Sequence, residues 1–463
     1  MNGSVDTRKP RKKRKKYHQF NVLFSTTDYE VFAALYKHRL LTVEMLYQLV
    51  VKKTGTHTFE SFRARLKKLS VKGYLEAQSV SGTDVLKTDH VHAHERAYYL
   101  SDKGVHLAAS FLRLDEYGFD AEGAFNKRYL EAAELKVHKQ IDHHFLTQRV
   151  VVDTLCTLEE KNEGMRFYEY IYGYGDSFAL TWEYEGKTKR IFPDWVFLPL
   201  PESHGSSLGK IAIEADRSTM NVEQLERKLL GYRNHVYQNS EQYQESPLHL
   251  VIAVESKSTK RRIRTLLQNS FLIFEDLIHQ GLIKVYVKDY REAPLQIVNI
   301  LENTPYEVDI DGCRHALLRL VTRNTGYTLR NELLDYQSED LHGLKMNPDR
   351  EFVFWKASEE EKRIFLLSAD KGSVNDQARA IYMKQELLKE PRFFVLMVYP
   401  TRSSLVEDVF IDTVNRQRQI VNFGKQILLT SMEDLNEGRL YQVEADYKKS
   451  QKLKAVMIQD VFH

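Results

Sequence analysis

The sequence has little cysteine and no long apolar run. Its 463 residues include only two cysteines, Cys156 and Cys313, which stand far apart in the chain. Isolated cysteines exclude a disulfide framework and a zinc site built from cysteines. No run of apolar residues approaches the roughly 20 that a membrane-spanning helix needs, and the glycine-rich loops for ATP and for dinucleotides are both missing. These absences predict a cytoplasmic protein that has no membrane span and lies outside those nucleotide-dependent classes.

The composition is typical of globular domains. Hydrophobic residues make up 42% of the chain and charged residues 28%, which is enough apolar mass for several cores. A chain of this length is expected to form about three domains. The net charge is only +3, so the position of the charges is more informative than their sum.

The N-terminal region, residues 1–24, contains a dense block of positive charge. Residues 8–16 read Arg-Lys-Pro-Arg-Lys-Lys-Arg-Lys-Lys, and such a block repels itself and buries nothing. We expect a disordered arm that binds nucleic acid phosphates; an acidic membrane surface, a localisation signal and a solvated tail are the alternatives. The arm lacks the apolar segment of a secretory signal. Its expected DNA contacts are Lys12, Lys13, Arg14, Lys15 and Lys16.

Three helical patterns follow the arm, at residues 27–38, 42–53 and 58–72. Each begins with a threonine that can cap its first turn, and each has apolar residues at helical spacing. The expected caps are Thr26 or Thr27, Thr42 and Thr58, and the expected apolar faces are Val31, Phe32, Leu35, Met45, Leu46, Leu49, Phe62, Leu66 and Leu69. Two strand-like runs at 74–80 and 95–101 and a helix at 101–112 come next. This order predicts a winged helix-turn-helix over residues 25–115.

The third of these helices carries the expected DNA-reading face. In a helix-turn-helix the second helix of the motif lies in the major groove, where its side chains meet base edges, and arginine suits bidentate contact with guanine. The expected contacts are His57, Arg63, Arg65, Lys67 and Lys68. A solvated basic face in a dimerisation module is the alternative.

The same region contains the run His90-Val-His92-Ala-His94. Histidines two residues apart on a strand share a face and can hold a divalent metal. With Tyr98 or Tyr99 nearby, such a pair would suit a nuclease with a tyrosine nucleophile. Because the run falls at the expected polar tip of the wing, we favour a solvated wing tip.

The middle region, residues 127–300, has the pattern of an α/β domain. A helical stretch at 127–160 contains His138, His143 and His144 among apolar residues, and we interpret these histidines as structural. The strand-like runs are 166–174, 178–186, 190–200, 207–216, 248–256 and 282–289, with helices at 221–238 and 258–280.

Three acids in this region predict a metal site. Glu214 and Asp216 point to one face of a strand because side chains alternate along it, and Asp194 stands on the preceding strand. Carboxylates gathered in this way repel one another and call for a counter-charge, for which Mg²⁺ or Mn²⁺ is suited. Such an ion would polarise a phosphodiester and activate a water. The alternative is that the acids remain from an ancestral nuclease and now only bind DNA or stabilise the sheet.

The middle region resembles the PD-(D/E)xK nuclease fold. This resemblance rests on Pro-Asp at Asp194 and on Glu-x-Asp at Glu214 and Asp216. A second resemblance is to the replication-relaxation family, and it rests on the run EADRSTMNVEQLERKLLGY, which follows the motif FPDW in the sequence. The nuclease pattern has lysine where Asp216 stands. We expect Lys228, on the following helix, to supply that cation, and Gln224 and Tyr232 to share its face and contact the DNA backbone.

Within the C-terminal region, residues 310–463, residues 350–437 repeat the element order of the second half of the middle region. RIFLLSAD at 363–370 is similar to KIAIEAD at 210–216, which pairs Asp370 with Asp216 and Ser368 with Glu214. This pattern predicts a degenerate second α/β copy without the acidic site.

The resemblance implies a protein of a plasmid or integrative element. We expect it to bind double-stranded DNA, and to nick DNA at a replication or transfer origin if the acids hold a metal. A non-catalytic transcription or replication regulator with a vestigial nuclease fold is the alternative. A homodimer and other replication or transfer proteins are the expected protein partners.

Overall fold

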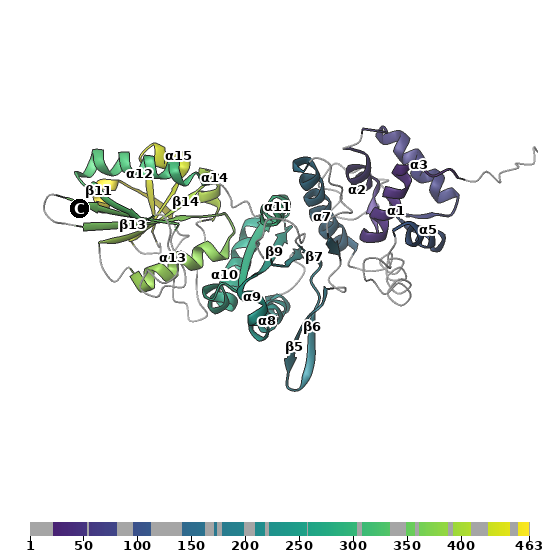
Figure 1. Cartoon of the computed structure of the whole chain (residues 1–463), viewed down its shortest axis with the longest axis horizontal. Coiled ribbons are helices and arrows are strands. Elements are labelled where there is room, and N and C mark those ends of the chain that lie inside the picture. Colours follow the sequence, from purple (N-terminus) through teal and green to yellow (C-terminus); the bar gives the residue numbers. More distant parts are fainter. Residues whose placement is uncertain are drawn as a thin grey trace, which may run out of the picture.

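The computed structural model describes residues 22–52, 55–80, 96–112, 141–162, 171–173, 178–198, 209–217, 222–256, 258–302, 308–333, 349–356, 361–387, 392–408, 425–444 and 452–462. Its helices and sheets form three parts that follow one another along the chain (Figure 1). The expected mixed α/β class is confirmed. The basic arm and the three histidines at positions 90, 92 and 94 lie outside the described residues.

The first part combines helices with a small antiparallel sheet. The helices are α1 (Thr26–His38), α2 (Val43–Tyr47), the π-helical turn η1 (Gln48–Lys52), α3 (Phe59–Val71) and α5 (Asp102–Leu112). The strands β1 (Leu41–Thr42), β2 (Leu75–Ser79) and β3 (Arg96–Leu100) pair in the order β1-β3-β2. All nine apolar residues expected to face the core are buried.

The helix starts follow the expected cap chemistry at two of three positions. Thr42 and Thr58 cap α2 and α3, because their side chains accept hydrogen bonds from the first turn. The expected cap of α1 at Thr26 or Thr27 is wrong. Ser25 caps this helix in a capping box with Asp28, which satisfies two backbone donors at once.

The middle part is built on a five-stranded sheet in the order β10-β9-β8-β7-β4. The strands are β4 (Ile171–Gly173), β7 (Trp195–Leu198), β8 (Ile211–Asp216), β9 (Leu248–Val254) and β10 (Ile283–Asp289). β7 runs antiparallel to both of its neighbours, β4 and β8. β8, β9 and β10 run parallel to one another.

Helices cover both faces of this sheet. Apolar residues of α7 (Ile141–Lys161) and α11 (Ala293–Leu301) pack on the face that includes Ile213 and Ala215. Residues of α8 (Val222–Gln238) and α10 (Thr259–His279) pack on the opposite face with Ala212. Side chains of β8 therefore alternate between the two layers, and Glu214 points toward the layer of α8, where it contacts Lys228.

The run at 190–200 was expected to be one strand, and the structure corrects this. It breaks at Phe192–Asp194 because Pro193 has no N–H for the ladder. Before the break, β5 (Leu180–Tyr184) and β6 (Lys187–Ile191) form a separate two-stranded hairpin, which projects from the body in Figure 1. Asp194 follows the break and begins the approach to β7.

The C-terminal part has a seven-stranded sheet in the order β11 to β17. The strands are β11 (Thr328–Leu333), β12 (Arg350–Trp355), β13 (Glu361–Ser368), β14 (Phe393–Tyr399), β15 (Ile427–Ser431), β16 (Leu440–Glu444) and β17 (Lys452–Val456). The helices are α12 (Ile310–Thr325), α13 (Val374–Leu387), α14 (Arg402–Asp408), α15 (Met432–Asn436) and α16 (Ile458–Phe462).

The first five of these strands repeat the topology of the middle sheet. β11, β12 and β13 are antiparallel neighbours, and β13, β14 and β15 are parallel. α12 precedes this series as α7 precedes the middle one, and α13 and α14 stand between the parallel strands as α8 and α10 do. This agreement of order, direction and connecting helices supports the expected duplication.

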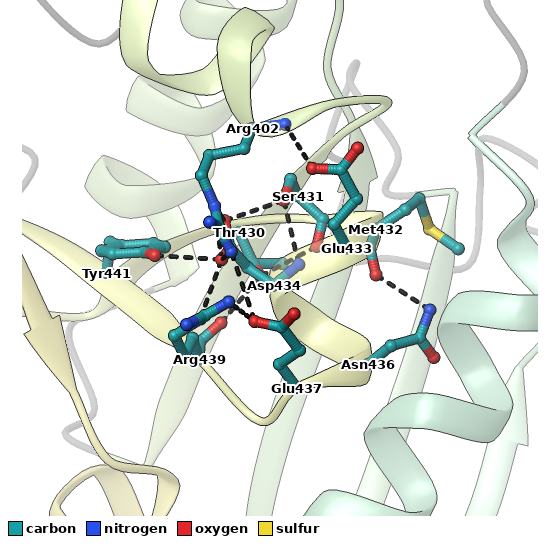
Figure 2. A network of polar contacts seen from close by, with 10 residues as sticks. All are labelled: Arg402, Thr430, Ser431, Met432, Glu433, Asp434, Asn436, Glu437, Arg439 and Tyr441. Carbon is teal, nitrogen blue, oxygen red and sulfur yellow. Dashed lines mark hydrogen bonds and ion pairs between the residues drawn. The ribbon is translucent and has the colours of Figure 1, made fainter.

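A network of polar contacts centred on Asp434 joins four elements of the C-terminal part (Figure 2). The fully buried carboxylate of Asp434 accepts hydrogen bonds from Arg402 Nε (2.9 Å), Arg439 Nε (3.0 Å), Tyr441 (3.1 Å) and Ser431 (2.8 Å). Every lone pair of a buried carboxylate needs such a partner. The network therefore holds α14, β15, α15 and β16 together, and its groups are all committed to structure.

The three parts are joined by continuous apolar packing. One core cluster includes residues of α1, α2, η1, α3 and α5 together with α7 and the middle sheet. A second cluster includes residues of α8, α10, α13 and β13. His38 Nδ1 donates a hydrogen bond to Gln148 Oε1 of α7 (2.7 Å), and the His38 ring stacks on Trp195 with 5.3 Å between the ring centroids. The expected division into three domains stays a prediction. Within the described ranges, no helix is long and apolar enough to cross a membrane.

Candidate functional site

Asp194 stands at the end of the middle sheet, held by the backbone of β8. Its own N–H donates to the carbonyl of Ile213 (3.1 Å), and its Oδ2 accepts from the N–H of Ala215 (2.8 Å). This pair of bonds fixes the carboxylate beside β8. Asp194 is thereby brought next to Glu214, the residue between its two backbone partners.

Lys228 of α8 bridges the two carboxylates. Its Nζ donates to Glu214 Oε2 and lies 3.5 Å from Asp194 Oδ1. The hydroxyl of Tyr232, one turn further along α8, donates to the other oxygen of Glu214. These four residues form one polar cluster against an apolar layer. Lys228 is 22% exposed and Asp194 16%, so the cluster is reached from solvent on one side.

The electrostatics of the cluster follow from its burial and its charges. Burial and the charge of Asp194 raise the pKa of Glu214 to about 8, and Lys228 and Tyr232 offset this only in part. Burial acts to raise the pKa of Asp194 too, but Lys228, His143 and the Ala215 N–H outweigh it and hold the pKa well below its ordinary value. Burial acts to lower the pKa of Lys228, yet the two carboxylates raise it above its ordinary value. Lys228 thus carries its charge between a strongly acidic carboxyl, Asp194, and a weakly acidic one, Glu214.

His143 joins the cluster from α7, on the other side of the sheet. Its Nε2 lies 3.0 Å from Asp194 Oδ2. The sequence pattern predicts a structural role for both His143 and His144, but His143 contacts Asp194 in the cluster, whereas His144 stays in the core. His144 is buried and its Nε2 bonds to the Leu40 carbonyl at 2.8 Å. Adjacent histidines in a helix point in different directions, and the pattern alone could not show which one reaches the sheet end.

Asp216 does not join the cluster, which corrects the expected set of three converging acids. Its two oxygens accept from Nε (2.6 Å) and Nη2 (3.0 Å) of Arg262, a residue of α10. A bidentate arginine pair satisfies the carboxylate fully. The motif Glu-x-Asp does not predict this partner, because Arg262 lies 46 residues downstream of Asp216.

The three carboxylates therefore do not fit a ready metal site. The ammonium of Lys228 stands between Asp194 and Glu214, where a divalent cation would bind, and Arg262 holds Asp216. Among the described residues, no group of three or more His, Cys, Asp or Glu side chains is placed to hold a metal ion. The positive charge that the acids need is supplied by the chain itself.

Tyr232 has a different place from the one expected. It is expected to share the helix face of Lys228 with Gln224 and to contact the DNA backbone, but its side chain is fully buried. Gln224 is exposed. The helix face that carries Lys228 and Tyr232 turns inward because Leu225, Leu229 and Val236 pack on the sheet.

The expected DNA-binding residues of α3 separate into two groups. Arg63, Lys67 and Lys68 are exposed, opposite the buried Phe62, Leu66 and Leu69. Within the described residues none of the three cations forms an ion pair. His57, half-buried just before the helix, uses its carbonyl to accept a hydrogen bond from Tyr47 at 3.2 Å.

Arg65 belongs to the packing of the first part. Its Nε donates to Asp28 Oδ1 (2.8 Å) and its Nη2 to the Leu23 carbonyl (2.8 Å). Asp28 is 1% exposed, and although burial acts to raise its pKa, the bonds from Arg65 and Ser25 lower it. A buried carboxylate needs this cation. The structure therefore assigns Arg65 to a structural ion pair, in place of the base contact that the sequence predicts.

The C-terminal part contains a counterpart of the cluster. Asp349 precedes β12 as Asp194 precedes β7, its N–H donates to Leu366, and its Oδ2 accepts from the N–H of Ser368. Its Oδ1 pairs at 3.1 Å with Arg379 of α13, which corresponds to Lys228. These bonds align Ser368 with Ala215, so the expected pairing of Ser368 with Glu214 is shifted by one residue.

The shifted alignment places Leu367 at the position of Glu214. Leu367 is fully buried in the apolar layer that includes α13. The second copy thus keeps the aspartate and a cation but replaces the glutamate with an apolar side chain. Loss of the acidic site from the second copy is expected from the sequence, and the register identifies the residue that replaces it.

Residues 32–247 match the family model described as replication-relaxation. The expected family is confirmed for this region. The replication-relaxation region includes α3, Asp194, Glu214 and Lys228, and it ends before β9. No curated protein and no solved structure matches the chain.

Proposed function

We propose that this protein is a DNA-binding factor of a plasmid or integrative element, and that its first part is a winged helix-turn-helix. The observation that carries the proposal is the exposed face of α3, where Arg63, Lys67 and Lys68 lie opposite a buried apolar face. Exposed cations that form no ion pair with any described residue are available for phosphates and base edges. The family match supplies the replication setting.

The arrangement around α3 supports this interpretation. α2 and η1 precede α3 as the first helix of a helix-turn-helix precedes the recognition helix. β2 and β3 then pair in antiparallel register from Leu75–Leu100 to Ser79–Arg96, as the strands of a wing do. Arg63 is near the N-terminal end of α3, the end that meets base edges in this motif.

Fluorescence anisotropy of the full chain with duplex DNA from its own replicon tests the proposal. Arg63→Ala should weaken binding to the preferred sequence more than to random duplex, because arginine reads guanine. Lys67→Ala with Lys68→Ala should weaken both duplexes equally, as phosphate contacts do. Glu60→Ala, on the same exposed helix, is the control. Binding that none of these cation substitutions changes would overturn the proposal.

A second candidate function, phosphodiester nicking, is favoured by one observation. Asp194, Glu214 and Lys228 meet at the end of the middle sheet, as the acids and the lysine of a PD-(D/E)xK nuclease do. Asp194 and Glu214 are the residues that would hold Mg²⁺ or Mn²⁺, which supplies a polarised phosphate and an activated water when it is bound. Lys228 would have to leave the space between them.

A supercoiled-plasmid assay with Mg²⁺ or Mn²⁺ distinguishes the two candidates. If the cluster cleaves DNA, Asp194→Ala and Glu214→Ala each abolish nicking and leave binding by the first part intact. If wild-type protein binds the plasmid but does not nick it with either ion, the nicking candidate fails and the non-catalytic DNA-binding factor stands.

A further inference from the structure

The hairpin β5–β6 presents a run of exposed cations. All four residues Lys187–Arg190 are exposed, and within the described part of the chain Lys187, Lys189 and Arg190 form no ion pair. The acid Glu183 accepts a hydrogen bond from Thr188 (2.6 Å) across the hairpin. Three cations in four residues without structural partners indicate a surface for a polyanion.

The two faces of the hairpin differ in charge. Tyr184 pairs with Lys187 and Trp182 with Lys189, so these four side chains share one face. Glu183 pairs with Thr188 on the other face, which also carries Arg190, so the acid and one of the three cations lie together there. The first face carries two lysines and a tyrosine that is 54% exposed, with no acid from either strand. Such a surface is complementary to DNA in charge and offers an aromatic side chain to it.

The hairpin has a shape that a DNA groove admits. Its turn consists of Glu185 (φ 53°) and Gly186 (φ 69°), two residues in the left-handed region, which is typical of a tight two-residue turn. Each strand has five residues and therefore extends about 15 Å. The major groove of B-DNA is about 12 Å wide and accepts a two-stranded β-ribbon.

The base of the hairpin is fixed to α8. His235 bonds to the Thr181 carbonyl (2.7 Å), and Gln238 bonds to both the N–H and the carbonyl of Glu183 (2.7 Å each). Gly231 leaves room for Trp182 and Ile191, because a Cβ there would approach both side chains to within 3.2 Å. The same helix carries Lys228, so the hairpin is held rigidly relative to the cluster around Asp194.

From these observations we propose that the β5–β6 hairpin is a second duplex-DNA contact, separate from α3, which enters a groove beside the Asp194 cluster. The proposal rests on the proposed DNA-binding function. β6 leads through Phe192 and Pro193 directly to Asp194. DNA held by Lys187 and Lys189 would therefore be fixed next to that site.

The test is the salt dependence of binding by the full chain to a random-sequence duplex of roughly three helical turns. Each phosphate contact contributes about 0.9 to the slope of log K against log salt. Lys187→Ala with Lys189→Ala should lower the slope by up to about 2 and weaken binding several-fold at low salt. Tyr184→Ala should weaken binding without changing the slope, because it removes no charge.

Two comparisons make the outcome decisive. Lys425→Ala with Lys454→Ala removes the same charge from exposed positions of the C-terminal part and should leave the slope unchanged. If wild-type protein binds and the hairpin variant keeps its slope, the hairpin proposal is overturned and the function of α3 stands. A third outcome is that the salt slope falls in the hairpin variant but not in the variant that combines Arg63→Ala, Lys67→Ala and Lys68→Ala. In that case the hairpin proposal is supported and the proposed role of α3 fails. Absence of binding by wild-type protein overturns both.

Discussion

Lys228 is the residue on which the cluster at the end of the middle sheet depends most, and Lys228→Met removes its charge while keeping its apolar length. Above pH 8 both Asp194 and Glu214 are ionised, because the pKa of Glu214 is about 8. The variant then leaves two buried carboxylates without their shared cation. Removing one partner of a buried pair costs 3–5 kcal/mol as a general range. Because Lys228 is 22% exposed, we expect a loss of about 3 kcal/mol at pH 9.

The same variant should cost less at lower pH. At pH 6 Glu214 carries a proton, so only Asp194 needs the cation, and His143 and the Ala215 N–H still contact it. We expect roughly half of the loss that is seen at pH 9. In a Glu214→Gln background the neutral amide still accepts from Tyr232, and the cost of Lys228→Met should no longer depend on pH.

Urea unfolding followed by tryptophan fluorescence at pH 6 and pH 9 measures these differences, with Trp195 buried beside the cluster. Arg227→Ala, an exposed neighbour on the same helix, is the control and should change stability by less than about 0.5 kcal/mol. A double-mutant cycle between Lys228 and Glu214 should give a coupling of about 2 kcal/mol at pH 9. The assigned role of Lys228 is refuted if Lys228→Met lowers the free energy of unfolding by the same amount at both pH values, or if the effects of the Lys228 and Glu214 substitutions are additive.

Three further predictions concern other parts of the chain. The pKa of Glu214 is raised to about 8 in the folded protein, so Glu214 keeps a proton there that it releases in the unfolded chain. Wild type should therefore lose stability relative to Glu214→Gln as the pH rises from 4.5 to 8, by a few kcal/mol in all. A constant difference in melting temperature across that window would contradict the raised pKa. Gly372→Ala should lower the free energy of unfolding by more than about 2 kcal/mol, because the new Cβ would lie 2.2 Å from the Val287 carbonyl oxygen at the junction with β10. Gly281 has a similar φ of 72° but open space around it, so Gly281→Ala should lower the free energy of unfolding by about 1 kcal/mol. Equal losses in thermal unfolding would exclude the clash as the cause. Deleting residues 1–16 should weaken duplex binding and reduce its salt slope, because fewer counterions are released; an unchanged slope would remove the arm from the DNA contacts.

Much of the first part could be predicted from local pattern. Helical spacing identified the buried faces of α1 to α3, and threonine at a helix start identified two caps. These features depend on residues within one or two turns. Ser25 was missed because the threonines that follow it are equally good cap residues. The ion pair of Arg65 with Asp28 spans 37 residues and has no local signal.

At the site, too, contacts that follow from local pattern could be predicted, whereas contacts that depend on long-range packing could not. Alternation along a strand placed Glu214 beside Asp194, and the inward face of α8 brought Lys228 to both. The pairing of Asp216 with Arg262 and the approach of His143 depend on how α10 and α7 pack on the sheet. The one-residue shift between the two copies depends on hydrogen bonds of Asp349 that sequence similarity does not contain.

Site-directed crosslinking measures whether α3 lies against DNA. Ala64 is exposed between Arg63 and Lys67, and the two native cysteines are buried or half-buried, so a photoreactive group on Ala64→Cys reports the surroundings of α3 alone. A matched group on Lys425→Cys, in the C-terminal part, is the control. We expect the α3 probe to crosslink to duplex DNA far more than the control does, and unlabelled duplex to compete with this crosslinking. Crosslinking at α3 that does not exceed that at position 425, in a protein that binds the duplex, would contradict the placement of α3 against DNA.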